Sequence, residues 1–378
     1  MKVMIVVTHL LGTGHLSRTL TLARGMQAAG QQVVLVSGGM PVDHLSMNGV
    51  PWVQLPAIRS DGIRFTQLLD EHGAEVSPAF MLRRQAALLS TFARIAPDVL
   101  VTELFPFGRR MLRTEFLALL DTAKVAGTKV AASVRDILNP PSTPAKADWA
   151  DEIVGRYYDT VLVHADPGIV ELDASWPVRH PLSERVVYTG FVAPNPPGQH
   201  PERAGEDEIL VSAGGGAVGG PLFAAARAAA EVDGTRHWRL FLGGADAIDR
   251  IADLAHGAPA NLSVEPARRD FREMLQGAAA SVSLCGYNTA LDVLQSGVPA
   301  VFVPFDTGGE AEQQLRAGAL ARLPGIEVLQ SSALNERTLA DTLRRAITAP
   351  RRAPLRDGVD GASVSAKVLA DLAKRQQA

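Results

Sequence analysis

The sequence predicts two α/β domains of the Rossmann type, each a parallel sheet covered by helices. Its 378 residues exceed the size at which one hydrophobic core usually stops growing. Short apolar runs alternate with helical stretches in two series, and a proline-rich break separates them. We therefore expect an N-terminal domain over 1–193, a linker over 194–206 and a C-terminal domain over 207–350. A final helix within 351–378 is expected to pack back on the N-terminal domain.

The predicted strands are the short apolar runs between turn residues. In the first series they cover 3–7, 33–37, 99–102, 129–133, 160–164 and 186–189, and in the second 209–212, 238–242, 262–265, 280–284 and 300–303. Strands that alternate with helices are typical of parallel sheets with helices on both faces. We expect the two sheets to face a cleft between the domains.

Composition excludes several classes of protein. Charged residues make up 20% of the chain and the net charge is −3, so no broad basic surface for nucleic acid is expected. The single cysteine, Cys285, excludes an internal disulfide and a multi-cysteine metal cluster. No apolar stretch approaches the roughly 18 residues of a spanning helix. We expect a cytoplasmic protein that is soluble or attached to the inner membrane surface. The apolar and cationic residues at 80–84 could form such a membrane-binding face, but a half-buried helix explains them better.

A glycine turn follows the first predicted strand. Gly12, Thr13, Gly14 and His15 lead into a helix that carries Arg18. Parallel sheets bind ligands at such strand ends, where the next helix presents unpaired N–H groups. No third glycine follows at dinucleotide spacing, which disfavours an NAD site. A purely structural turn is the alternative interpretation.

Charged residues follow two further strands of the first series. Glu103 and Arg109 come after 99–102, and Arg135 and Asp136 after 129–133. The arginines could hold an anionic acceptor or a donor phosphate, while Glu103 or Asp136 could orient a base or bind sugar hydroxyls. A structural salt bridge between arginine and aspartate is equally consistent with the pattern.

A second glycine-rich loop follows the strand at 209–212. Ser212 leads into Gly214, Gly215 and Gly216, whose backbone is open to phosphate oxygens. The lysine of a P-loop is absent, so hydrolysis of a nucleoside triphosphate is not indicated. A flexible loop selected only for its turn is the alternative.

The most specific stretch is 283–305. A turn at Gly286 precedes Tyr287, and Asn288 or Thr289 is expected to cap the following helix, whose start could seat a diphosphate. Asp292 lies three residues after Thr289 on the same helix face, where its carboxylate could accept the hydroxyls of a ribose. An ordinary N-cap and a solvated aspartate are the alternatives.

From Gly286 to Phe305 the chain resembles the donor-binding segment of the family 28, MurG-like glycosyltransferases of the GT-B fold. The matching residues are Gly286, Asp292 where the family has glutamate, Gly297-Val298-Pro299, Val303-Pro304-Phe305 and the pair Gln313-Gln314. Residues 12–15 and 212–216 resemble the family's first and second glycine loops. The turn at 12–18 also resembles that of nucleotide-sugar hydrolases from pseudaminic-acid synthesis.

The resemblance implies transfer of a hexosyl or N-acetylhexosaminyl group from a nucleoside-diphosphate sugar, expected to be UDP-linked, to an acceptor hydroxyl. The acceptor, a saccharide, a lipid-linked molecule or a small molecule, would bind the N-terminal domain. The reaction is expected to invert the anomeric centre and to need no metal or other cofactor. A hydrolase that activates water, and a non-catalytic nucleotide-sugar binding protein, are the alternatives.

The expected roles divide the residues into three groups. His15 is the expected general base, with Glu103 and Asp136 as further catalytic residues. The donor-binding set is Ser212, Gly214, Gly215, Gly216, Gly286, Tyr287, Asn288, Thr289, Asp292, Gln313 and Gln314. The set that binds acceptor or phosphate is Gly12, Thr13, Gly14, Arg18, Arg109 and Arg135.

Overall fold

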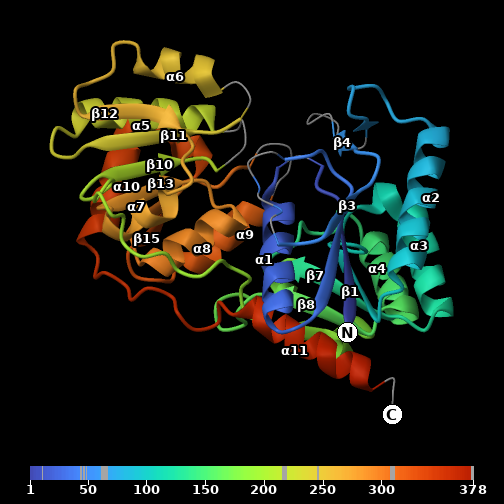
Figure 1. Ribbon diagram of the computed structural model, residues 1–378. Coiled ribbons are helices and arrows are strands. Elements are labelled where there is room, and N and C mark those ends of the chain that lie inside the picture. The colour runs from blue at the N-terminus through green and yellow to red at the C-terminus, as the bar shows by residue number, and fades with distance from the viewer. Residues whose placement is uncertain are drawn as a thin grey trace. The chain divides into compact units, whose positions relative to one another are not determined.

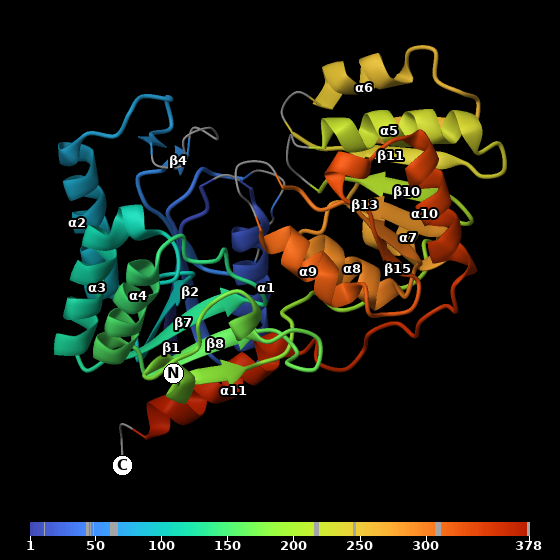
Figure 2. The same ribbon diagram turned by 180° about the vertical axis from the view of Figure 1, so that it is seen from behind.

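The chain forms two compact units in a computed structural model. One unit joins Met1–Ala193 to Gly358–Ala378, and the other spans Pro194–Asp357. The structure describes residues 1–10, 12–42, 45, 47, 49–60, 67–214, 219–244, 247–306 and 311–375. Figure 1 labels the elements of both units, and Figure 2 shows them from behind.

The first unit is built on a parallel sheet. Its described part has seven strands in the order β3-β2-β1-β6-β7-β8-β9. The strands are β1 (Lys2–Val7), β2 (Gln32–Ser37), β3 (Trp52–Gln54), β6 (Val99–Glu103), β7 (Lys129–Arg135), β8 (Thr160–His164) and β9 (Val186–Tyr188). A short antiparallel pair, β4 (Arg59–Ser60) with β5 (Leu68–Leu69), lies apart from this sheet. Because helices cover both faces, most strand residues are buried, as the apolar runs predict.

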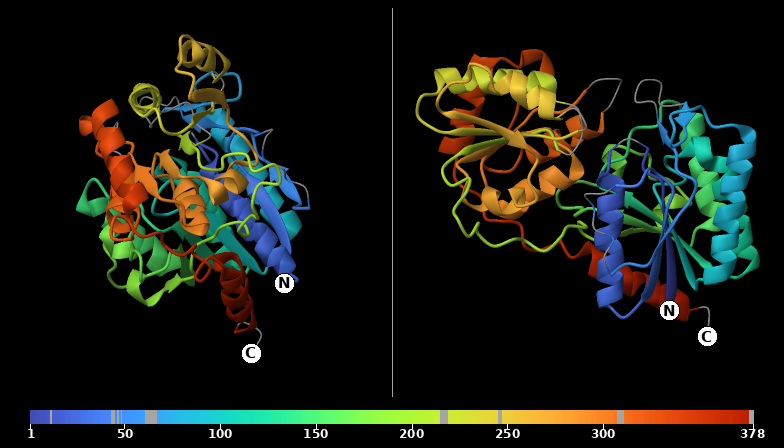
Figure 3. Two further views of the ribbon diagram at one scale, coloured as in Figure 1. Left: turned by 90° about the vertical axis from the view of Figure 1, so that its left-hand side faces the viewer. Right: turned by 45° about the horizontal axis from the view of Figure 1, so that its top comes forward.

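Helices cover both faces of this first sheet. They are α1 (Gly14–Ala28), α2 (Pro78–Ile95), α3 (Arg113–Val125), α4 (Pro144–Tyr157) and α11 (Gly361–Lys374), with short 3-10 turns at Arg110–Leu112, Leu172–Ala174 and Leu182–Glu184. α1 and α11 lie side by side on one face, and α2, α3 and α4 cover the other (Figures 1 and 3). The first pair packs closely at Gly25, where a Cβ atom would lie 2.4 Å from the Cβ of Ala362.

A buried arginine fixes α2 to the strand ends. The Arg84 side chain is fully buried, and its Nε donates to Glu115 Oε2 of α3 at 2.9 Å. Its Nη1 donates to the carbonyl of Gly38 at 2.9 Å and its Nη2 to Thr8 Oγ1 at 3.2 Å. Residues 8 and 38 directly follow β1 and β2, so this one guanidinium positions both loops.

The second unit repeats the same architecture. Its described strands form a parallel sheet in the order β12-β11-β10-β13-β14-β15. They are β10 (Ile209–Ser212), β11 (Trp238–Leu242), β12 (Leu262–Pro266), β13 (Ala280–Ser283), β14 (Ala300–Phe302) and β15 (Ile326–Val328). The helices are α5 (Gly220–Val232), α6 (Ala247–Ala255), α7 (Phe271–Gly277), α8 (Tyr287–Ser296), α9 (Glu312–Leu320) and α10 (Glu336–Thr348), with a 3-10 turn at Ser331–Ala333.

The two faces of the second sheet carry different helices. Apolar residues of α5 and α10 form one core with the strands, while α7 and α8 lie together on the other face (Figure 3). The prediction of two parallel-sheet α/β domains is confirmed. The sequence analysis did not predict β3, β4, β5 or β15. Each of these strands is at most three residues long and none lies in a continuous apolar run of the kind that identified the equally short β9 and β14.

Each sheet contains one point where the chain reverses the direction in which strands are added. In the first sheet it lies between β1 and β6, and in the second between β10 and β13. Ligands of open parallel sheets bind outside the carboxyl ends of the strands at such points. The loops that follow these four strands are therefore the places where a site is expected.

Among the described helices, none combines the length and the apolar composition that crossing a bilayer requires.

Gly219 has a conformation that the substitution G219A tests. Its φ is +102°, and a Cβ atom there would lie 2.4 Å from the Cβ of Ala213. We expect G219A to lower the free energy of unfolding by about 1 to 3 kcal/mol, because alanine rarely adopts this conformation and would clash. The matched control is G220A, where a Cβ atom meets nothing within 4 Å. Equal thermal midpoints for the two variants would contradict this account.

Candidate functional site

The first glycine turn presents a histidine to a buried glutamate. His15 lies in the first turn of α1, and Glu103 is the last residue of β6. The Nδ1 atom of His15 and Oε1 of Glu103 are 2.8 Å apart, and Arg18 Nη2 also donates to that oxygen. The Glu103 side chain is 1% exposed and that of His15 is 15% exposed. The strand order therefore brings together residues that lie 88 positions apart in the chain.

The charges of this pair fix the roles of the two histidine nitrogens. Burial opposes ionisation of Glu103, but its contacts with His15 and Arg18 and the nearby charge of Arg109 hold its pKa well below the usual range. Burial lowers the pKa of His15 to about 4, although Glu103 acts in the opposite direction. At neutral pH the imidazole is therefore neutral beside a carboxylate. Because a carboxylate only accepts, we assign the proton to Nδ1, which leaves the lone pair of Nε2 to act as a base.

Arginines surround this pair. Arg109 donates from Nε to the carbonyl of Thr8 at 2.6 Å, and burial lowers its pKa. Arg135 ends β7 and is half-buried, and its charge also lowers the pKa of His15. Asp136 is buried, and its Oδ1 accepts the backbone N–H of Ile137 at 2.8 Å. The structure thus brings Arg18, Arg109 and Arg135 to one sheet edge, whereas the hydrogen bond that it describes for Asp136 stabilises its own loop.

The loop after β6 is held in an unusual conformation. Leu104 and Arg109 have φ values of +68° and +59°, which non-glycine residues rarely adopt. Between them Phe105 stacks on Phe116 with ring centroids 4.6 Å apart, and Phe107 meets Trp176 edge-on at 5.3 Å. These aromatic contacts hold the strained backbone, so Arg109 is presented from a firmly packed loop.

Two further histidines at this edge were not predicted as site residues. His164 ends β8; its Nε2 lies 2.8 Å from Ser133 Oγ and its Nδ1 2.8 Å from Thr189 Oγ1. Burial lowers the pKa of His164 to about 3, so it is neutral. His9 follows β1 and is 3% exposed, and neither of its ring nitrogens has a hydrogen-bond partner of normal geometry among the described residues. In the sequence both resemble the polar end of an apolar strand, and only the strand order reveals their position.

The second glycine loop is described in part. Ser212 ends β10, and its Oγ accepts the N–H of Gly214 at 3.1 Å. Gly214 has a φ of +78°, and a Cβ atom there would meet nothing within 4 Å. This start of the loop is thus open around the backbone. Gly215 and Gly216, expected to contact phosphate, lie outside the described residues.

The helix α8 begins without the expected cap. Its N-cap is Gly286, and no side chain in the described chain caps it. The prediction that Asn288 or Thr289 caps the helix is wrong, because both lie inside the first turn, beyond the position from which a side chain can cap. They are half-buried, while Tyr287 is buried.

The loop before α8 is fastened by α9. Gln313 Oε1 accepts the N–H groups of Cys285 at 2.9 Å and of Phe305 at 3.1 Å. Arg316 Nη1 donates to the carbonyl of Cys285 at 2.9 Å, and its Nη2 pairs with Glu312 at 2.8 Å. Gln313 therefore joins the loops that follow β13 and β14, whereas Gln314 is exposed. Arg316 and Glu312 were not predicted, although their i,i+4 spacing is the signal that could have found the pair.

Asp292 is neither solvated nor exposed. Its Oδ1 accepts a hydrogen bond from Nε of Arg272 on α7 at 2.7 Å, and its side chain is 18% exposed. Burial raises its pKa to about 6, and the nearby Glu273 adds to the rise, while Arg272 opposes it. The carboxylate that the resemblance assigns to a ribose thus already has one cationic partner.

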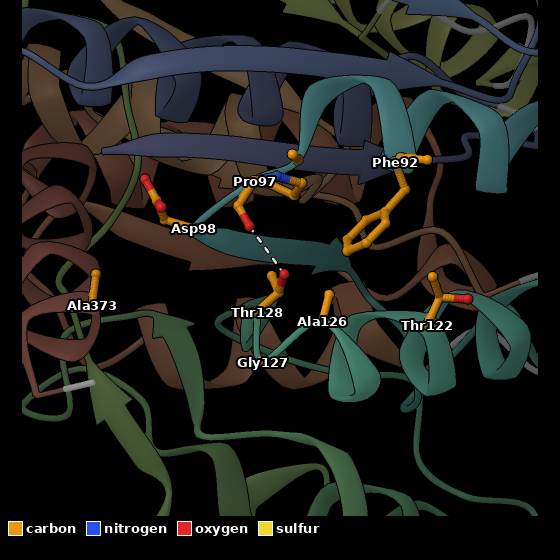
Figure 4. A pocket seen from close by; sticks show the side chains of 10 residues that line it. Phe92, Pro97, Asp98, Thr122, Ala126, Gly127, Thr128 and Ala373 are labelled. Atoms are coloured by element: carbon orange, nitrogen blue, oxygen red, sulfur yellow. Dashed lines mark hydrogen bonds between the residues drawn. The ribbon is translucent and has the colours of Figure 1, made fainter. Parts of the chain in front are cut away.

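A hollow in the first unit lies away from the predicted site residues of that unit. Figure 4 shows its lining, which includes Phe92, Pro97, Asp98, Thr122, Thr128 and Ala373. Asp98 and Thr128 directly precede β6 and β7, so the hollow lies at the amino ends of strands whose carboxyl ends carry Glu103 and Arg135. None of the predicted site residues lines it.

Comparison with known proteins decides the family. Residues 255–372 match the family model for the glycosyltransferase family 28 C-terminal domain. This match assigns the C-terminal part of the chain to glycosyltransferase family 28. The chain is a MurG-like nucleotide-sugar glycosyltransferase of the GT-B fold.

Relatives that align over most of the chain agree with this match. The UDP-N-acetylglucosamine--N-acetylmuramyl-(pentapeptide) pyrophosphoryl-undecaprenol N-acetylglucosamine transferase of Paraburkholderia xenovorans is 27% identical over 88% of this chain and 83% of its own. The crystal structure of MurG from Acinetobacter baumannii has a TM-score of 0.60 at 17% identity, covering 99% of this chain and 100% of its own. The glycosyltransferase VinC, solved with dTDP, has a TM-score of 0.64 at 15% identity, with 100% of both chains covered. The comparisons do not support the resemblance to nucleotide-sugar hydrolases.

Substitutions can distinguish the contributions of Gln313 and Gln314 to stability. We expect Q313A to lower the free energy of unfolding by about 1 to 3 kcal/mol, because the N–H groups of Cys285 and Phe305 lose their acceptor. Q313E keeps an acceptor oxygen and should retain most of that stability. Q314A, at an exposed position, should change it by less than about 0.5 kcal/mol. Chemical denaturation of the three variants measures this, and a Q314A loss as large as that of Q313A would contradict it.

Proposed function

We propose that this enzyme transfers a hexosyl or N-acetylhexosaminyl group from a UDP-sugar to an acceptor hydroxyl bound by the N-terminal unit, with His15 as general base. The geometry of His15 and Glu103 supports this role: a neutral imidazole, 2.8 Å from a buried carboxylate, at the reversal point of a parallel sheet. The N-acetylglucosaminyltransferase name of the Paraburkholderia xenovorans relative supports the donor class.

The proposed reaction is a single displacement. Nε2 of His15 takes the proton of the acceptor hydroxyl while the hydroxyl oxygen attacks the anomeric carbon and the bond to the nucleoside diphosphate breaks. Glu103, which accepts from Nδ1, stabilises the imidazolium that forms. Attack opposite the leaving group inverts the anomeric centre. Inversion and independence of metal ions remain predictions.

On the donor side, the N–H groups at the start of α8 and of the loop after Ser212 are proposed to bind the diphosphate, with Gly286, Tyr287, Asn288 and Thr289 lining it. Asp292 would accept the ribose hydroxyls. Because Gln313 Oε1 already holds two backbone amides, its Nε2 or the exposed Gln314 is left for the donor sugar. The unpaired backbone dipoles of a helix start supply this binding without a bound cation.

On the acceptor side, Arg18, Arg109 and Arg135 give the sheet edge a positive potential. This charge supports an acceptor with an anionic group, and the lipid-linked diphosphate in the name of the Paraburkholderia relative is one such molecule. Gly12, Thr13 and Gly14 provide the turn that brings His15 to this edge.

The substitution H15A tests the catalytic role. After thermal stabilisation by UDP, GDP and dTDP has identified the donor base, sugar transfer is measured with the corresponding nucleotide sugars and a panel of acceptors. We expect H15A to lower kcat by about 100-fold or more, because a general base contributes at least this much. The control H72A removes an exposed histidine and should leave kcat unchanged.

Two results would count against the proposed function. A few-fold loss in H15A would remove the base assignment. Release of UDP from the nucleotide sugar at an undiminished rate without acceptor would indicate hydrolysis in place of transfer.

The pH dependence separates His15 from Asp292. The folded-state pKa of His15 is lowered, so the base stays deprotonated, and active, to lower pH than an ordinary histidine. At saturating donor and acceptor, kcat should be flat from pH 8 to pH 5.5 and fall as the pH approaches about 4. The donor KM should instead rise below about pH 6, where Asp292 takes up a proton. Half-loss of kcat near pH 6.5 would contradict the first expectation.

A further inference from the structure

One arginine connects the expected ribose residue to its surroundings. Arg272 lies near the start of α7, and its Nε donates to Asp292 Oδ1 at 2.7 Å. Its Nη2 donates to Gln295 Oε1 at 2.7 Å. Asp292 and Gln295 are three residues apart on one face of α8, so a single guanidinium binds both. Arg272 and Gln295 are not among the residues on which the resemblance to family 28 rests.

The guanidinium is itself held in place. The carbonyl of Pro194, the first residue of the second unit, accepts from Arg272 Nη2 at 3.3 Å and from Gln295 Nε2 at 3.2 Å. The side chains of Arg272 and Asp292 are 22% and 18% exposed, so solvent screens this ion pair only in part. A planar group that donates to three acceptors has little freedom to reorient, and neither has the carboxylate oxygen that it contacts.

The arrangement uses one oxygen of Asp292 and leaves the other available. Among the described residues, Arg272 donates to Oδ1 and no hydrogen bond reaches Oδ2. The charged groups that face the carboxylate come from α7: Arg272, which attracts it, and Glu273, which repels it. Without the arginine, a carboxylate in this position would be buried beside another carboxylate, a setting that favours the protonated form.

We propose that Arg272 is a positioning residue for the donor: it fixes Asp292 through Oδ1 as an ionised carboxylate and leaves Oδ2 to accept the ribose hydroxyls. The inference rests on the proposed function, in which Asp292 binds the ribose. Asp292 is one methylene shorter than the glutamate of the family, and the ion pair supplies an orientation that the shorter side chain needs in order to present a single oxygen. A purely structural ion pair between α7 and α8 is the competing account.

The test compares R272Q, R272K and the control R344Q, which removes an exposed arginine paired with Asp341 on α10. Dissociation constants are measured by calorimetry with UDP and with GDP, each beside its 2′-deoxy form, at pH 7 and pH 8.5. We expect wild-type protein to prefer the ribonucleotide. R272Q should weaken ribonucleotide binding about tenfold and lose most of that preference, because charge-assisted hydrogen bonds to the hydroxyls are lost. R272K, which keeps the charge, should recover part of both, and R344Q should match wild type.

Measuring the dissociation constants at two pH values distinguishes a positioning role of Arg272 from a purely structural one. Arg272 lowers the pKa of Asp292, so its removal raises that pKa further above the ordinary value and leaves more of the carboxyl protonated at pH 7. Raising the pH restores the charge. The ratio of the R272Q to the wild-type dissociation constant should therefore fall between pH 7 and pH 8.5. A ratio that is equal at both values, with the ribose preference intact, would overturn the proposal even if R272Q were less stable.

A further variant separates failure of this inference from failure of the proposed function. D292N should weaken the ribonucleotide as much as R272Q does, and the double variant should be no weaker than either single one. If D292N binds like wild type while UDP or GDP still binds, the ribose assignment is wrong and the inference falls with it. If wild-type protein binds none of UDP, GDP and dTDP, the proposed function itself is overturned. If R272Q does not fold, R272K and D292N decide the question by the same ratios.

Discussion

The buried carboxylate of Glu103 is the constraint on which the first edge depends. A charge that is 1% exposed is costly unless hydrogen bonds and opposite charge compensate it. His15 and Arg18 provide this compensation from the first turns of α1, because a residue and the one three positions later face the same side of a helix. The requirement to partner Glu103 therefore fixes the rotation of α1 and, with it, the direction in which the imidazole of His15 presents its second nitrogen.

In the second unit, polar side chains of α9 fix the loop that precedes α8. The start of α8 can present backbone N–H groups only if the loop before it is immobile, and Gln313 and Arg316 fix this loop through the N–H and the carbonyl of Cys285. Glu312 in turn neutralises the buried Arg316. In both units, then, a buried ion pair orients a polar group at the carboxyl end of a parallel strand, where the fold gathers ligand-binding loops.

The sequence predicted the two parallel sheets because their central strands are buried on both faces and appear as apolar runs. β1, β6, β8 and β10 lie within a residue or two of the predicted ranges. The short edge strands β3 and β15 escaped prediction because polar residues interrupt them, whereas the equally short β9 begins with two valines. The failed capping prediction for α8 has a similar origin. Asn288 and Thr289 have the right chemistry, but the N-cap is Gly286, two residues before the first of them and three before the second.

Site residues that are close together in the sequence could be predicted, whereas partners that are far apart in the sequence could not. His15 and Arg18 share one turn of helix, so a motif contains them both, and Glu103 is the end of a recognisable strand. Arg272 precedes Asp292 by 20 residues and Arg316 follows Cys285 by 31, and in each case the partners come from different helices or loops. A sequence pattern records which residues could be charged at a strand end. Which cation compensates which buried acid depends on the packing of neighbouring helices, and only that packing reveals that Asp292 has one oxygen bound and one left to act.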